Sequence, residues 1–252
     1  MAASAVLSGF VAGLFGIGGG LITVPVLFYI FSSTGLDQTF IMHLAVGTSF
    51  AIIIPTSIAS TMTHIKFKGV DFGIVKTFGI FAIIGVILGT IFAASLKTAS
   101  LILFFSIITM FIAIYFLIVM EKINFAPRKI NLIYRTIFGF LSGFLSAPMG
   151  IAGGIINTPI LKMFGYPINV AIGTSAGIGF LISLIGAIGF ATSGSYLNIN
   201  APLSLGFVNV PAFLIFVPIT TFMAKIGAKT VHKVNKKLIG KLFGIFLLFV
   251  SC

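Results

Sequence analysis

A cluster of glycines interrupts an apolar stretch near the start of the chain, where residues 16–20 read Gly-Ile-Gly-Gly-Gly within the apolar residues 2–31. Each glycine in a helix interior costs about 1 kcal/mol relative to alanine, so the cluster predicts a break in a helix. A stretch this apolar lies in lipid, where broken backbone is tolerated only if protein buries it or it lines a wet cavity. The glycines therefore mark either a close helix crossing or a binding site at membrane depth.

The glycine-rich pattern occurs a second time, at residues 142–161, which align without gaps with residues 8–27. Ten of these twenty aligned positions are identical, where composition alone would give roughly two or three. A second shared segment follows each copy, Ala-Val-Gly-Thr-Ser at 45–49 and Ala-Ile-Gly-Thr-Ser at 171–175. The chain is therefore predicted to be a duplicated unit, with repeat 1 at 1–125 and repeat 2 at 132–252 inside one membrane domain covering 1–252.

The composition is that of an integral membrane protein, because 59% of the 252 residues are hydrophobic and only 7% are charged. The net charge of +12 does not indicate a nucleic-acid partner, since the basic residues stand in short loops, where they set membrane topology. The single cysteine, Cys252, excludes an internal disulfide. With about 20 residues for one span, the apolar segments are 2–31, 40–63, 72–96, 99–120, 132–164, 168–193, 203–228 and 236–252.

The basic residues favour a topology with two re-entrant segments. If all eight segments cross the membrane, seven Lys and Arg residues fall on one side and eight on the other, against the positive-inside bias. If segments 2–31 and 132–164 enter and leave on the same face, fourteen fall on one side and only Lys97 on the other. The prediction is an all-α polytopic membrane protein with two inverted repeats. Each repeat is a glycine-broken re-entrant helix followed by three transmembrane helices.

Inverted repeats with discontinuous helices are typical of secondary transporters, whose sites lie near the midplane between the repeats. Thr23 and Asn157 hold the same repeat position, two residues before Pro25 and Pro159, and predict helix N-caps there. A helix start offers unpaired N–H groups and the positive end of the helix dipole, which suit an anion. The hydroxyls of the repeated Thr-Ser pair add neutral donors. The candidate substrate-binding residues are Gly18, Gly19, Gly20, Thr23, Thr48, Ser49, Gly153, Gly154, Asn157, Thr174 and Ser175.

The acidic residues favour an anionic substrate over a cationic one. All three, Asp37, Asp71 and Glu121, are predicted in loops or at segment ends, whereas a cation site at the midplane usually needs carboxylates. We expect no metal and no cofactor. His43 and His64 are predicted to be interfacial, with a proton-coupling role open for His43. The glycines could serve packing alone, and the Thr-Ser hydroxyls could bond back to the preceding turn of their own helices.

Other functional classes have requirements of their own. An anion channel, or a carrier for another small organic anion such as a carboxylate, could use the same donors, and a channel would also need a continuous pore. A membrane enzyme would need a nucleophile, a metal set or a paired acid and base. Because no segment interior holds a carboxylate and the one cysteine is terminal, the sequence predicts that the protein is not an enzyme.

The duplicated Gly-x-Gly-Gly-Gly…Pro stretch and the repeated Ala-x-Gly-Thr-Ser together resemble the sulfite exporter TauE/SafE family, small bacterial membrane proteins with two related halves. The resemblance covers nearly the whole chain. Residues 18–20 match the family's glycine motif in full, whereas the second copy has Ala152 before its glycine pair. The resemblance implies a multi-pass protein of the bacterial cytoplasmic membrane that transports sulfite, an organosulfonate or a related small oxyanion.

Overall fold

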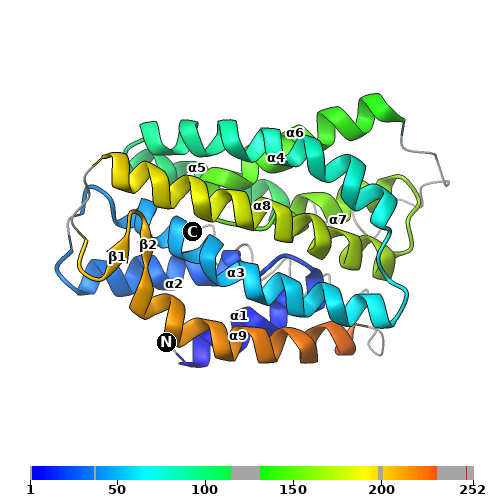
Figure 1. Ribbon diagram of the computed structural model, residues 1–252, viewed down its shortest axis with the longest axis horizontal. Helices are drawn as coiled ribbons and strands as arrows, with labels where there is room; N and C mark the ends of the chain where they lie inside the picture. Colours follow the sequence, from blue (N-terminus) through cyan, green and yellow to red (C-terminus); the bar gives the residue numbers. More distant parts are fainter. Residues whose placement is uncertain (1, 37, 115–130, 198–200, 232–247, 249–252) are drawn as a thin grey trace.

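The computed structural model describes residues 2–36, 38–114, 131–197, 201–231 and 248, and these residues are mostly helical (Figure 1). The predicted eighth segment at 236–252 and the repeat boundary at 121–131 lie outside the described residues, apart from 131 and 248. In chain order the elements are α1 (Ala2–Phe15), α2 (Gly20–Ser33), α3 (Ile41–Lys66), α4 (Phe72–Ser95), α5 (Thr98–Ile114), α6 (Leu132–Met149), α7 (Gly154–Met163), α8 (Ile168–Tyr196), β1 (Ser204–Leu205), β2 (Val208–Asn209) and α9 (Val210–Thr230).

Five of these helices, α3, α4, α6, α8 and α9, are long and apolar enough to cross a membrane. The helices α1 and α2 have 14 residues each, which at 1.5 Å per residue is about 21 Å and less than a hydrocarbon core of about 30 Å. The predicted helical, multi-pass class is confirmed. In α3 and α8, 83% and 72% of an apolar 18-residue stretch is buried inside the protein, against 28% to 44% in the other three helices. These two helices therefore form the centre of the bundle.

Left-handed glycines produce the first helix break. Between the last residue of α1 and the first of α2, Gly16, Gly18 and Gly19 have φ angles of +68°, +73° and +85°. Side chains with a Cβ rarely adopt these angles, whereas glycine does so freely. The glycine cluster is therefore what allows the chain to leave one helix and enter the next within four residues.

The second break, residues 150–153 between α6 and α7, has the same construction, with Gly150 and Gly153 at φ +62° and +68°. It also corrects one prediction. Gly19 and Gly153, not Thr23 and Asn157, are the N-caps of α2 and α7. Helix begins directly after the last left-handed glycine, so Thr23 and Asn157 lie one turn inside their helices. Pro25 and its counterpart in α7 consequently lie inside the helices, where each removes an N–H donor to a preceding carbonyl.

Residues 203–209 also differ from the prediction, which extended a helix over 203–228. Strands β1 and β2 pair antiparallel as a small hairpin that turns through Gly206 at φ +55°. The side-chain oxygen of Asn209 accepts a hydrogen bond from the N–H of Ala212 at 3.0 Å, and Pro211 stands in the first turn of α9. This cap and the proline fix the start of α9 at Val210. The described fold is therefore helical apart from one hairpin.

Helices of the two halves pair crosswise through small residues. The helix α1 lies alongside α9, and α6 lies alongside α4 (Figure 1). A Cβ built on Gly9 or Gly13 of α1 would meet the backbone of α9, and one on Gly143 of α6 would overlap the backbone of α4. Small residues let two helices approach this closely in a membrane. The first helix of each half is therefore packed against a long helix of the other half.

Most of the described basic residues lie at one end of the bundle, which holds the ends of α3, α7 and α9 and the starts of α4, α6 and α8 (Figure 1). Two hydrogen bonds join parts of this end: Arg135 to Thr77 Oγ1 at 3.0 Å, and Tyr166 Oη to Asp71 Oδ2 at 3.3 Å. Lys97 lies at the opposite end, between α4 and α5. The basic residues toward the first end are Lys66, Lys68, Lys76, Arg135, Lys162, Lys225 and Lys229.

Candidate functional site

The two helix breaks lie against each other inside the bundle. A Cβ built on Gly20 would overlap the carbonyl oxygen of Gly150, and one built on Gly154 would overlap that of Gly16. These contacts are reciprocal, because each break presents a glycine to a carbonyl of the other. The structure thus brings together the two glycine clusters that the sequence marks as candidate site residues.

The central helices flank this meeting point. A Cβ on Gly18 would lie 2.6 Å from a side-chain methyl of Ile53 in α3, and one on Gly179 of α8 would lie 2.8 Å from Cβ of Ala152 in the second break. Both contacts fall near the middle of these long helices. The breaks are therefore at the centre of the bundle along its length as well as across it.

Both helices that begin at the breaks have uncapped starts. Neither Gly19 nor Gly153 has a side chain, and no side-chain hydrogen bond caps α2 or α7. The first N–H groups of a helix have no partner inside the helix, and they carry the positive end of its dipole. Two positive helix ends thus point at one buried region.

The polar side chains on either side of the first break, Ser8 of α1 and Thr23 of α2, find their hydrogen-bond partners there. The hydroxyls of Ser8 and Thr23 lie 2.7 Å apart, and they reach the carbonyl oxygen of Gly19 at 3.0 and 3.1 Å. Both side chains are buried. The first break therefore forms a closed hydrogen-bonded group of its own.

The aligned residues beside the second break lack these hydrogen bonds. Ser142 and Asn157 align with Ser8 and Thr23, and both are completely buried. The Ser142 hydroxyl and both the nitrogen and the oxygen of the Asn157 amide have no hydrogen-bond partner. A buried polar group left unpaired costs about 1–3 kcal/mol, so this pair is kept at a cost to stability.

The threonines of the two Thr-Ser pairs hold the starts of long helices. Thr48 Oγ1 accepts a hydrogen bond from the N–H of Asn209 at 2.9 Å, and Thr174 Oγ1 accepts one from the N–H of Asp71 at 2.9 Å. Asn209 and Asp71 are the N-caps of α9 and α4. Each threonine therefore connects its own half to a helix of the other half. Accepting this bond leaves the hydroxyl hydrogen as a donor.

The serines of the same pairs contact the second break. Ser49 Oγ donates to the carbonyl oxygen of Gly150 at 2.8 Å, and Thr158 Oγ1 donates to Ser175 Oγ at 3.0 Å. These bonds tie the second break to α3 and to α8. Sequence reasoning did not select Ser142 or Thr158, although Ser142 is identical between the repeats and could have been found from that identity.

Both histidines of α3 are buried within the protein, close to the two ends of that helix, and their predicted interfacial depth stays a prediction. His43 Nε2 lies 3.2 Å from the carbonyl oxygen of Ala93, and its ring stacks on Phe207 with centroids 5.1 Å apart. His64 Nε2 lies 3.3 Å from the carbonyl oxygen of Gly13. The ends of α3 are covered by neighbouring elements, so nearness to a helix end does not expose a side chain here.

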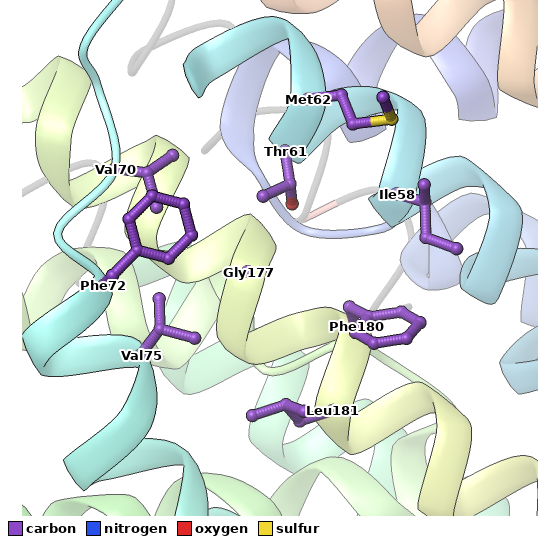
Figure 2. A pocket seen from close by; sticks show the side chains of 9 residues that line it. All are labelled: Ile58, Thr61, Met62, Val70, Phe72, Val75, Gly177, Phe180 and Leu181. Carbon is purple, nitrogen blue, oxygen red and sulfur yellow. The ribbon is translucent and has the colours of Figure 1, made fainter.

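A cavity of about 200 Å³ lies between α3, α4 and α8, and no residue of either break lines it (Figure 2). Apart from Thr61 its walls consist of apolar side chains and Gly177, with Phe72 and Phe180 among them. One threonine hydroxyl is too few donors to bind an anion. Among the described residues, no group of three or more His, Cys, Asp or Glu side chains could hold a metal ion.

Comparison with known proteins identifies the family. The sequence profile described as "Sulfite exporter TauE/SafE" matches residues 1–252. The chain belongs to this family. A "Probable membrane transporter protein" of Haemophilus influenzae is 31% identical over 245 residues, covering 97% of this chain and 93% of the relative. Relatives with the same description in Methanocaldococcus jannaschii and Bacillus subtilis are 30% and 29% identical, covering 97% and 98% of this chain and 93% of each relative. No solved structure matches the chain significantly.

Proposed function

We propose that this protein is a secondary transporter that carries a small sulfur oxyanion, sulfite or an organosulfonate, across the bacterial cytoplasmic membrane. Membership of the TauE/SafE family and the printed descriptions of the relatives support the class of function. The observation that carries the proposed site is the meeting of two uncapped helix starts at the centre of the bundle. The anion would lie at this meeting point.

Electrostatics favour an anion there. Each helix N-terminus carries about half a positive elementary charge, so two such ends in one buried region repel each other unless an anion lies between them. Backbone N–H groups at the starts of α2 and α7 supply neutral donors. Ser49 and Ser175 hold the second break beside them through their hydrogen bonds. A compact oxyanion presents several acceptor oxygens and can be bound by such donors without a lysine or arginine.

The topology we propose has two re-entrant hairpins, α1–α2 and α6–α7, that enter from opposite faces. Residues 1–125 and 132–252 would then form inverted repeats, an arrangement typical of transporters with broken helices. Three observations support it: the short α1 and α2, the crosswise pairing of α1 with α9 and of α6 with α4, and the collection of seven of the eight described basic residues toward one end.

Transport of radiolabelled sulfite into proteoliposomes tests the function. We expect uptake that saturates with concentration and that is accelerated by unlabelled sulfite or methanesulfonate on the opposite side, because a carrier exchanges its substrates. Empty liposomes and an excess of acetate are the controls. Flux that never saturates would indicate a channel, and inhibition by acetate as strong as by methanesulfonate would indicate a carboxylate carrier.

A further inference from the structure

We infer that the side chains that bind the transported anion come only from the helices beside the second break, namely Asn157 of α7 and Ser142 of α6. The side chains beside the first break then make no ligand contacts, and that break is a structural counterpart. This inference rests on the proposed function, because it names the residues that act within the same site. It predicts an asymmetric site inside a duplicated protein.

The two breaks differ in how their buried polar atoms are satisfied. Ser8 and Thr23 bond to each other and to the carbonyl oxygen of Gly19. At the aligned positions, Ser142 and Asn157 leave one hydroxyl and two amide atoms without partners, although neither residue is exposed. Buried polar groups in native proteins are nearly always paired, so each exception calls for an explanation. A bound ligand provides one.

The unpaired groups stand beside an uncapped helix start. Asn157 lies in the first turns of α7, whose N-cap is the left-handed Gly153. The Ser142 hydroxyl lies 2.9 Å from where a Cβ on Gly153 would be, which places the hydroxyl at the break itself. A hydroxyl, an amide and the positive end of a helix therefore lie together. The amide nitrogen and the hydroxyl can donate to an oxyanion without introducing a charge.

Neighbouring helices hold this break in place. Ser49 of α3 donates to the carbonyl oxygen of Gly150, and Thr158 of α7 donates to Ser175 of α8. These bonds fix the backbone on both sides of the unpaired groups. A site whose surroundings are hydrogen-bonded while its central donors are unpaired is preorganised for a ligand.

The test changes the polar side chains beside the second break, one of them to the residue found at the aligned position in the first half. Asn157→Thr recreates the serine–threonine pair already accommodated in the first half, and Ser142→Ala removes the hydroxyl. Thr23→Val in the first break is the matched control. Sulfite binding to each purified full-length variant is measured by calorimetry, and the melting temperature of each is recorded without ligand.

We expect Asn157→Thr to raise the Kd for sulfite about tenfold or more while its melting temperature stays equal to or above that of the wild type, because a hydrogen bond to a charged group is lost and unpaired atoms are removed. Thr23→Val should keep Kd within about twofold. An unchanged Kd in Asn157→Thr would overturn the inference, and the proposed function would still stand. No sulfite or methanesulfonate binding by the wild type would overturn both.

Discussion

Thr48 and Thr174 show that a repeated polar pair can serve the fold. Each accepts a hydrogen bond from the backbone N–H of a helix-capping residue in the other half of the chain, Asn209 or Asp71. The sequence marks both threonines as candidate ligands, and that role stays a prediction. What the geometry adds is that each oxygen already has a structural partner, so substitution there affects folding before it affects binding.

Replacing Thr48 by valine keeps the side-chain shape and removes the acceptor of a buried N–H group. We expect a loss of about 1–3 kcal/mol in the free energy of unfolding, since the Asn209 N–H is left unpaired. Thr174→Val should cost less, because the bond to Asp71 is only partly buried. Thermal unfolding followed by circular dichroism in detergent measures both.

Thr192→Val is the control for this pair, because the exposed Thr192 bonds only to carbonyl groups of its own helix. Its melting temperature should equal that of the wild type. If Thr48→Val has the same melting temperature as Thr192→Val, the bond between Thr48 and Asn209 contributes nothing measurable to stability.

At the scale of elements, the contact between the two breaks depends on glycines that have no room for a side chain. A Cβ on Gly154 would overlap the carbonyl oxygen of Gly16, which is backbone and cannot move away on its own. We expect Gly154→Ala to separate the two helix starts and to reduce sulfite flux at least about tenfold, since displacements of about 1 Å at a site cost this much or more. Flux per folded protein in proteoliposomes is the measurement.

Gly177→Ala provides a matched comparison within the same bundle. Its Cβ would come closest to a side-chain methyl of Val75, at 3.0 Å, and Val75 lines the apolar cavity and can shift into it. This variant should keep its flux. If Gly154→Ala transports as well as Gly177→Ala does, close contact between the breaks is not needed for transport.

The sequence alone predicts the helical segments and both breaks, because apolar length and glycine clusters are local signals. The α1 bounds follow from the glycine at residue 16, and the Thr-Ser pairs fall inside α3 and α8 as predicted. The helix caps could not be predicted in the same way. Thr23 and Asn157 are good N-caps by residue type, but the left-handed Gly19 and Gly153 determine where the helices begin.

Other features of the structure depend on tertiary contacts that leave little trace in the sequence. Residues 203–209 continue an apolar segment, yet Gly206 and Asn209 turn them into a hairpin before α9. The burial of His43 and His64 depends on α4, on α1 and on Phe207, all distant in sequence. The difference between Ser8–Thr23 and the unpaired side chains of the second break becomes visible only when hydrogen bonds can be counted.

For the whole molecule, the proposed topology predicts which side of the membrane each end of the bundle faces. Ser33 is the last residue of α2 at one end, and Lys68 lies in the loop between α3 and α4 at the other end. In a Cys252→Ser background, cysteine at Ser33 should react with an impermeant maleimide in intact cells, whereas cysteine at Lys68 should react only after permeabilisation, because basic loops stay in the cytoplasm. Both positions are exposed, so reactivity reports the membrane side.

Cysteine at Lys97 serves as a second outside position, since Lys97 is the one described basic residue at the far end. It should label together with Ser33. Labelling of Ser33 and Lys68 from the same side would contradict the proposed topology, because α3, which lies between them, would then not cross the membrane.

The crosswise pairing also sets the order in which the protein can be completed during synthesis. The partner of α6 is α4, which leaves the ribosome earlier, so the second hairpin finds its packing surface as soon as it is made. The partner of α1 is α9, which is made roughly 200 residues later. In the proposed topology, the first hairpin would stay in the bilayer without α9 during that interval. The hydrogen bonds among Ser8, Thr23 and Gly19 lie entirely within this hairpin, so its buried polar groups can be paired before α9 is synthesised.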